Sequence, residues 1–426
     1  MTQIDCCTPS RPVPLLATPP RRGGRVRRLT RRLAPLLVPA LLVAALGCRE
    51  DTESPTAPES GPALDVTPAH VLSFRQVSTG HFHTCGVTTN DLAYCWGRNS
   101  DGQLGDNTTT GRRLTPVRVV GGLRFRQVSA DGGMHACGVT TDNQAYCWGG
   151  NRSGQLGDGT LISRRTPVAV AGGLLFRQVS TGFDHTCGVT TDDRAYCWGL
   201  NIGGELGDGT ATNRLTPVAV AGGLQFRQVS AEGFAHTCGV TTDDRAYCWG
   251  SNGGALGDGT TTNRLTPVAV AGGLRFRQVS AGGFQHSCGV TTNDRAYCWG
   301  FNQFGPLGDG TTTRHLKPVR VASGRHRFLQ VNAGADFTCA LTFDRAFCWG
   351  NNFYGQLGDG TTTTRLTPVR VVGGVRFRQV SAGGLHTCGV TTGDLAYCWG
   401  RNNFFGALGD GTLLNRRRPT AVAGAS

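Results

Sequence analysis

The tripeptide Cys-Trp-Gly occurs seven times in this chain of 426 residues, and it contains every tryptophan of the sequence. The tryptophans follow one another at intervals of 50 to 52 residues, at Trp96, Trp148, Trp198, Trp249, Trp299, Trp349 and Trp399. A nearly constant period of this length indicates one structural unit that has been copied and stacked. The repeated residues must build the fold, so function is expected in the residues that differ between copies.

Each copy contains short runs that are typical of β-strands. The runs are Phe-Arg-Gln-Val-Ser, His-x-Cys-Gly-Val-Thr, Ala-Tyr-Cys-Trp-Gly and Pro-Val-Ala-Val, and Gly, Asn-Asp and Asp-Gly turn signals separate them. Four strands in each of seven copies predict an all-β, seven-bladed β-propeller over residues 71–426, with repeats that start near residues 74, 125, 176, 226, 276, 328 and 377. The alternative is an open β-solenoid, but the repeat is too long for one coil and neither terminal copy looks like a polar cap.

The N-terminal residues predict export. Basic residues between 21 and 32 precede an apolar run from Leu33 to Gly47, which predicts a signal peptide over residues 1–47. The run is too short, and too interrupted by proline, for a membrane span. Ala45-Leu46-Gly47-Cys48 resembles the lipobox of bacterial lipoproteins, which predicts lipidation of Cys48, and the polar residues 48–70 predict a disordered tether. Cleaved secretion and an uncleaved anchor are the alternatives. The expected location is the cell envelope outside the cytoplasm, or the medium.

The net charge of +14 does not predict nucleic-acid binding. Residues 1–47 alone contain eight arginines and one acidic residue, and the remaining arginines recur once or twice per repeat. A nucleic-acid footprint needs a clustered basic patch. We therefore interpret these arginines as solvated blade edges.

Several motifs resemble the regulator of chromosome condensation repeat: Gly-x-x-His before a strand, then Trp-Gly-x-Asn-x-x-Gly-x-Leu-Gly-Asp-Gly, then Pro-Val. The resemblance extends over all seven copies. It implies a seven-bladed ring that is closed by joining the two termini in one blade. The family includes the nucleotide exchange factor for the small GTPase Ran and a secreted bacterial inhibitor of β-lactamase. An exported chain meets neither Ran nor chromatin, so exchange activity is not expected here.

Fourteen of the seventeen cysteines form seven pairs, with turn residues midway between the members of each pair. Folding the segment from Cys187 to Cys197 as a hairpin places these two residues opposite each other, within disulfide range. We therefore predict seven disulfides, which are compatible with export. The pairs are Cys85 and Cys95, Cys137 and Cys147, Cys187 and Cys197, Cys238 and Cys248, Cys288 and Cys298, Cys339 and Cys348, and Cys388 and Cys398.

Reduced thiols and a metal site are the alternatives for these cysteines. His185, Cys187 and Cys197 would form a His-Cys-Cys cluster, but zinc requires a fourth ligand and none recurs. The sixth copy has Phe337 in place of the histidine and keeps both cysteines. We predict neither a metal nor a cofactor.

Two other repeated residue types are expected to be structural. The recurring histidines are spread evenly around the ring, whereas catalysis needs one constellation, so each is expected to bond to a turn backbone. The recurring Asp-Gly-Thr segments lack the further carboxylates of a calcium loop and predict turn caps. A hydrolase would need a polar site that breaks the symmetry of the central channel, and the repeats offer none, so no enzymatic activity is predicted. The histidines are His83, His135, His185, His236, His286 and His386, and the aspartates are Asp158, Asp208, Asp258, Asp309, Asp359 and Asp410.

Two stretches vary between copies: one precedes the histidine and one follows Cys-Trp-Gly. Loops of an up-and-down blade alternate between two faces, so both stretches are expected on one face. Large apolar residues there mark a recognition surface, although packing between blades is the alternative. The residues predicted to bind a partner are Phe284, Phe301, Phe304, Phe353, Tyr354, Phe404 and Phe405. The predicted function is a monomeric, lipid-anchored scaffold that binds a protein, with binding of a cell-wall or surface glycan as the alternative.

Overall fold

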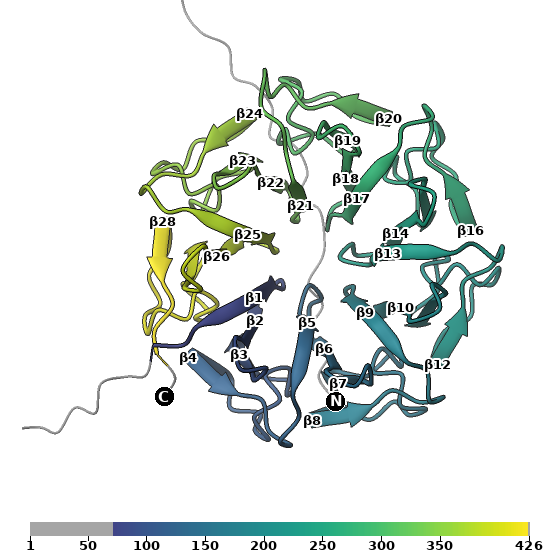
Figure 1. Ribbon diagram of the computed structural model, residues 1–426, viewed down its shortest axis with the longest axis vertical. Coiled ribbons are helices and arrows are strands. Elements are labelled where there is room, and N and C mark those ends of the chain that lie inside the picture. The colour runs from purple at the N-terminus through teal and green to yellow at the C-terminus, as the bar shows by residue number, and fades with distance from the viewer. Residues whose placement is uncertain (1–70, 425–426) are drawn as a thin grey trace, which may run out of the picture. The chain divides into compact units, whose positions relative to one another are not determined.

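The computed structural model describes residues 71–424. The predicted signal peptide, the lipidation site Cys48 and the predicted tether lie outside the described residues. The described residues form seven antiparallel four-stranded sheets, which are arranged as blades around a central axis (Figure 1). The predicted all-β, seven-bladed propeller with blades of about 50 residues is therefore confirmed.

Four consecutive strands make each blade. The first three blades consist of β1 (Phe74–Thr79), β2 (His83–Thr88), β3 (Ala93–Arg98) and β4 (Arg112–Arg118); β5 (Phe125–Ser129), β6 (His135–Thr140), β7 (Ala145–Gly149) and β8 (Arg164–Ala169); and β9 (Phe176–Thr181), β10 (His185–Thr190), β11 (Ala195–Gly199) and β12 (Arg214–Ala219). The fourth and fifth consist of β13 (Phe226–Ser230), β14 (His236–Thr241), β15 (Ala246–Gly250) and β16 (Arg264–Ala269); and β17 (Phe276–Ala281), β18 (His286–Thr291), β19 (Ala296–Gly300) and β20 (His315–Arg320). The last two consist of β21 (Gln330–Ala333), β22 (Phe337–Leu341), β23 (Ala346–Gly350) and β24 (Arg365–Arg370); and β25 (Phe377–Ala382), β26 (His386–Thr391), β27 (Ala396–Gly400) and β28 (Arg416–Ala421).

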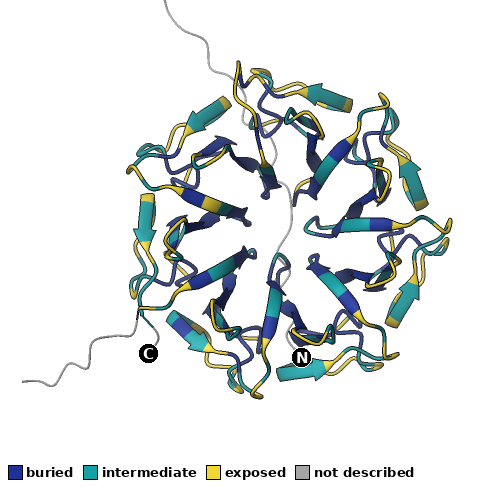
Figure 2. Cartoon of the chain, viewed as in Figure 1, coloured by how far each residue is buried: buried dark blue, intermediate teal, exposed yellow. Residues whose placement is uncertain are grey.

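Burial decreases from the middle of each blade to its rim (Figure 2). The second strand of every blade is buried along its whole length, whereas the fourth strand is half-buried or exposed apart from Pro116 in the first blade. Neighbouring blades cover both faces of the inner strands, which explains their continuous apolar and small residues. The outermost strand has the alternating polar pattern of a strand with one wet face.

The cysteine hairpins have the register that the sequence predicts. Cys187 pairs with Cys197, and Thr186 with Trp198. All seven cysteine pairs form disulfides, and their Cα atoms are 4.0 to 4.1 Å apart. The sixth pair, which is one residue closer in sequence, is also directly opposed.

The hydrophobic cores lie between blades rather than within them. The disulfide of the first blade packs with Leu104 against Phe125, Val128 and Trp148 of the second blade. The indole N–H of Trp148 also donates a 3.0 Å hydrogen bond to the carbonyl oxygen of Gln103 in the first blade. The Cys-Trp dipeptide thus serves two cores, because its two side chains point to opposite faces of the strand.

The first strand of each blade is fixed to the next blade by its own side chains. The amide of Gln76 donates to the carbonyl oxygen of Val128 at 2.8 Å and accepts from the N–H of Val128 at 3.0 Å. The same two bonds recur at Gln127, Gln178, Gln228, Gln278, Gln330 and Gln379.

The neighbouring arginine is also structural. Arg75 donates to the carbonyl oxygen of Phe125 in the next blade and forms an ion pair with Asp91 in its own blade. The interpretation of the repeated arginines as solvated blade edges is therefore wrong for this position.

The ring does not close in the way that the family resemblance implied. The first and last strands, β1 and β28, belong to different blades that lie next to each other (Figure 1). The seventh blade contacts the first through the same pair of glutamine bonds that joins every other pair of blades, and the indole N–H of Trp96 also donates to the carbonyl oxygen of Ala407. A blade built from both chain ends is unnecessary, because each blade carries both the glutamine that binds the next blade and the backbone groups that bind the glutamine of the preceding blade.

Residues 71–424 contain no helix with the length and apolar character needed to cross a bilayer.

Candidate functional site

The two variable stretches of each blade lie on one face of the propeller, which we call the loop face. In the fifth blade, the N–H of Phe301 in the β19–β20 loop donates to the carbonyl oxygen of Gln285 in the β17–β18 loop at 2.9 Å. The glycine of Cys-Trp-Gly permits this approach: Gly300 has a φ of +101°, and a Cβ there would lie 2.3 Å from that oxygen. The glycine therefore brings the two loops together.

The predicted partner-binding residues form two groups on this face. Phe284, Phe301 and Phe304 line a pocket of about 630 Å³ at the fifth and sixth blades. Phe353 extends this group, because its ring lies 5.9 Å from that of Phe304. Tyr354, Phe404 and Phe405 lie around the junction of the sixth, seventh and first blades.

The first group surrounds a pocket with two charged residues. The lining also includes Phe234, Gly283 and Gln285. The charged residues of the lining are Arg314 and Asp336. Burial raises the pKa of the Asp336 carboxyl to about 6, and a hydrogen bond from Asn351 partly opposes this shift.

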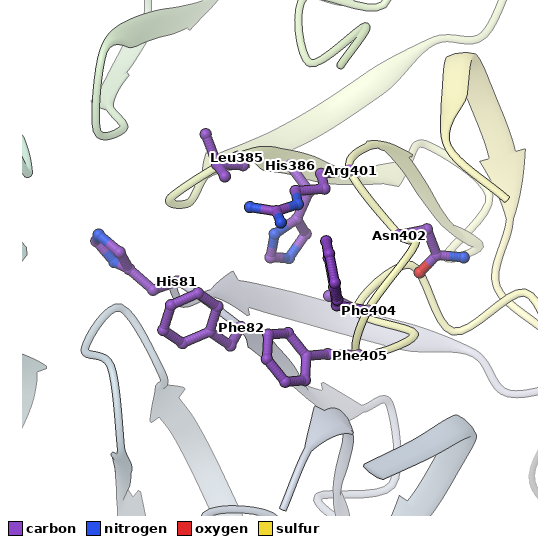
Figure 3. Close-up of a pocket in the computed structure, with 9 residues that line it drawn as sticks. His81, Phe82, Leu385, His386, Arg401, Asn402, Phe404 and Phe405 are labelled. Carbon is purple, nitrogen blue, oxygen red and sulfur yellow. The ribbon is translucent and has the colours of Figure 1, made fainter. Parts of the chain in front are cut away.

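In the second group, aromatic rings hold two arginines, and Figure 3 shows one of them, Arg401, beside Phe404. The guanidinium of Arg401 lies 4.9 Å from the ring centre of Tyr354 and 4.6 Å from that of Phe404. Arg98 lies 5.6 Å from the ring centre of Phe82 and 5.8 Å from that of Phe405. Cation–π attraction and packing between blades therefore account for part of this group, as the alternative interpretation expected.

An aromatic cluster covers the end of the central channel below the loop face. His81 of the first blade reaches across the ring, and its ring centre lies 5.8 Å from that of Phe183 and 4.8 Å from that of Phe234. Phe234 in turn lies 5.1 Å from Phe284 of the pocket. Both ring nitrogens of His81 are buried without a hydrogen-bond partner, and burial lowers the pKa of His81 to about 4.

Two carboxylates enter the channel below this cluster. The hydroxyls of Ser78 and Ser129 donate to Asp131, and the side chains of Ser280 and Asn332 donate to Glu232. Burial raises the pKa of Asp131 to about 6. Burial, together with the charge of Asp131, raises the pKa of Glu232 well above its usual range.

The sequence-based expectation that no polar residue breaks the channel symmetry is therefore wrong. Asp131 and Glu232 follow the Ser-Ala end of the first strand in the second and fourth blades, where the other blades continue directly with glycine. The acidic residue at this position was the sequence signal that could have indicated a polar site in the channel.

The repeated histidines are structural, but their partner differs from the one predicted. His135 Nε2 lies 2.8 Å from the hydroxyl oxygen of Thr186 in the next blade, rather than at a turn backbone. The Thr186 hydroxyl donates to the carbonyl oxygen of Gln155, so the proton between the two side chains belongs to His135. The same arrangement joins His185 to Thr237, His236 to Ser287, His286 to Thr338 and His386 to Thr84.

The Asp-Gly-Thr segments form the predicted turn caps. Asp158 Oδ1 accepts from the N–H and the hydroxyl of Thr160, and Asp158 Oδ2 pairs with Arg164 at 2.9 Å. Among residues 71–424, no cluster of three or more His, Cys, Asp or Glu side chains is arranged to hold a metal ion. The paired cysteines are disulfides and so offer no thiolate for the alternative zinc site.

This architecture is that of a known family. The family model of the RCC1-like domain matches residues 43–340. The chain belongs to the RCC1-like domain family. Models of the Regulator of chromosome condensation (RCC1) repeat match residues 344–390, and residues 328–356 and 377–406, in the remainder of this RCC1-like domain.

Curated relatives match only parts of the RCC1-like chain. The Ultraviolet-B receptor UVR8 of Arabidopsis thaliana is 34% identical over 124 residues, which are 28% of this chain and 28% of the receptor. The probable E3 ubiquitin-protein ligase HERC6 of Homo sapiens is 32% identical over 112 residues, which are 25% of this chain and 11% of the ligase. The chain thus spans less than a third of the length of either protein.

Solved structures share the fold of this RCC1-like domain. Human WBSCR16 has a TM-score of 0.69 at 23% identity, over 75% of this chain and 88% of that protein. Prp20p from Saccharomyces cerevisiae has a TM-score of 0.70 at 21% identity, over 80% of this chain and 87% of that protein. At these identities the similarity establishes the architecture alone.

Proposed function

We propose that this RCC1-like chain is an exported scaffold that binds a protein partner through its loop face and catalyses no reaction itself. The observation that carries the proposal is the exposure of aromatic side chains around a pocket on this face. Phe284, Phe353 and Phe404 are 46%, 60% and 52% exposed. Exposed aromatic residues beside a pocket are typical of protein-recognition surfaces.

The relatives support a protein as the bound partner. The structure of Prp20p was described together with its binding to Gsp1p and histones, and yeast RCC1 (Prp20) was solved bound to Kap60. Those interactions are properties of the yeast protein. They favour a protein over a glycan here because the same ring architecture presents the loops.

The disulfides support export. Seven disulfides in one domain are typical of proteins from oxidising compartments. Anchoring through a lipid on Cys48 agrees with the sequence of the N-terminal segment. Cys48→Ala should move the chain from the membrane fraction to the soluble fraction, and alkylation without reductant should label none of the fourteen blade cysteines. Retention of Cys48→Ala in membranes would contradict the lipid anchor.

The channel carboxylates do not suggest a hydrolase. Asp131 and Glu232 are half-buried and line a channel cavity of about 160 Å³, and serine hydroxyls donate to oxygen atoms of both, which holds each carboxylate in place. A catalytic acid or base must instead reach the proton that it transfers. We therefore assign the pair a structural part in the channel.

Site-specific photocrosslinking tests the binding face. p-Benzoylphenylalanine is placed at Phe353 or Phe404 on the loop face, or at Asp192 in the exposed β10–β11 turn on the other face. In cells that produce the chain naturally, we expect a discrete crosslinked protein from positions 353 and 404 and none from position 192. Crosslinks from position 192 alone, or from none of the three positions, would refute the proposal.

A further inference from the structure

The pocket of the fifth and sixth blades has the composition of a site for a cation on an alkyl stem. Its walls are the rings of Phe284, Phe301 and Phe304, with Phe234 beside them. Aromatic faces carry partial negative charge and attract ammonium and guanidinium groups. Its volume of about 630 Å³ is large enough for a long side chain.

Asp336 adds a carboxylate that has no internal counter-charge. Among residues 71–424 it forms no ion pair, and its one stabilising contact is the hydrogen bond from Asn351. Arg314 also lines the pocket, but it exerts no resolved effect on Asp336. Arg314 is exposed, without an ion pair in the described part of the chain, and its stem lies near Gly254 of the fourth blade. A partly desolvated carboxylate favours a cation from outside.

Equivalent positions in two other blades show that aromatic rings on the loop face hold a guanidinium group. The residue directly after Cys-Trp-Gly is Arg401 in the seventh blade and Arg98 in the first, and each lies over two aromatic rings. In the fifth blade the equivalent residue is Phe301. The fifth blade therefore has the aromatic surroundings without the arginine that occupies them elsewhere.

We propose that this pocket receives an arginine or lysine side chain of the protein partner, with its cationic group at Asp336 and its alkyl stem against Phe284, Phe301 and Phe304. The inference rests on the proposed function, because it names the chemistry of the partner at the same face. Arg314, which also lines the pocket, is available to meet an acidic group that neighbours the inserted side chain.

A neutral analogue of arginine provides the sharpest test. The full chain is labelled with 4-fluorophenylalanine at Phe301 and titrated with N-acetyl-arginine-methylamide or N-acetyl-citrulline-methylamide, while the ¹⁹F resonance is recorded. The two probes have the same shape, and only the first carries a charge. We expect arginine to bind about ten-fold more tightly than citrulline, as a desolvated cation–π and carboxylate site implies.

Two matched variants assign the effect to Asp336. Asp336→Asn should abolish the preference for arginine over citrulline. Asp184→Asn is the control. Asp184 occupies the position equivalent to Asp336, directly before the second strand of its blade, but it lies in the third blade and does not line the pocket. Thermal melting of both variants shows whether the fold is retained.

Three outcomes would overturn the inference: equal affinities for the two probes, no ¹⁹F shift with either at saturating concentration, or a preference that survives Asp336→Asn. Binding of a neutral oligosaccharide, chitotetraose, that is lost in Phe301→Leu but unchanged in Asp336→Asn would assign the pocket to a glycan instead.

If positions 353 and 404 still crosslink a protein while the arginine preference is absent, the inference fails and the proposed function stands. If the preference is present without crosslinks, the proposed function fails.

Discussion

The side-chain amide of Gln379 forms two hydrogen bonds with the backbone of Val77, of 2.8 Å and 2.9 Å, across 302 positions of sequence. These bonds join the seventh blade to the first, at the one junction of the ring that no polypeptide link crosses. Gln379→Leu should lower the free energy of unfolding by about 1–3 kcal/mol, because two backbone groups lose their partner. Urea denaturation measures the change.

Gln178→Leu removes the same two bonds at a junction that the chain does cross, and it is the matched control. We expect a similar loss of global stability, but faster deuterium exchange in β1 and β28 only in Gln379→Leu. Equal exchange of these strands in both variants would show that the unlinked junction is no weaker than the others.

His83 offers a route to a more stable protein. It faces Ala136, where the equivalent residue of every other blade is threonine or serine, and both of its ring nitrogens are buried without a partner. Ala136→Thr should raise the free energy of unfolding by about 1 kcal/mol, since its hydroxyl accepts from His83 and donates to the carbonyl oxygen of Gln103. Ala136→Val has nearly the same shape without the hydroxyl, and a gain as large in that variant would contradict the hydrogen-bond explanation.

Acid should destabilise the ring through its buried histidines. Burial lowers the pKa of His185 from 6.5 to about 3. The stabilisation from neutral His185 is therefore complete above pH 6.5 and is lost as the pH falls, because the unfolded chain takes up the proton first. His185→Phe imitates the natural Phe337 of the sixth blade. Between pH 6 and pH 5 it should reduce the pH dependence of the unfolding free energy by about 1.4 kcal/mol per pH unit, and an unchanged slope would contradict the assignment.

The channel carboxylates should act in the opposite direction at higher pH. Because the pKa of Glu232 is raised in the folded chain, the folded state keeps a proton that the unfolded chain has released, so stability falls as the pH rises. Above pH 4.5, the usual pKa of a glutamate, Glu232→Gln should flatten this fall by up to about 1.4 kcal/mol per pH unit. Asp142→Asn is the control, because Asp142 lies in the exposed β6–β7 turn, outside the channel. The same slope in wild type and Glu232→Gln would contradict the raised pKa of Glu232.

The contacts within a blade could be predicted, whereas the contacts between blades could not. The opposition of Cys187 and Cys197 depends only on strand alternation and the centre of one turn, and both can be derived from spacing. The bond from His135 to Thr186 depends on the angle between two blades, which no local pattern specifies. For the same reason the ring closure was predicted from resemblance and was wrong.

The candidate site was predicted in part. Exposed aromatic residues after Cys-Trp-Gly stand out against the repeat, and the loops that carry them share a face, as expected. The carboxylates Asp131 and Glu232 were missed because each appears as a single acidic residue in one copy. Only the ring brings these two residues, about 100 positions apart, into the same channel.

The way in which the blades join makes the position of the chain ends interchangeable. Every blade is built from four consecutive strands, and all seven junctions share the two bonds between a glutamine side chain and the backbone of the next blade, so the junction without a polypeptide link is built like the others. A circular permutant that begins at Phe226 and links the present ends of the propeller by a short flexible segment would keep every strand pair and every junction. Such a permutant would allow a tether to be attached at any blade, and so allow the loop face to be rotated about the ring axis relative to the tether without altering its surface.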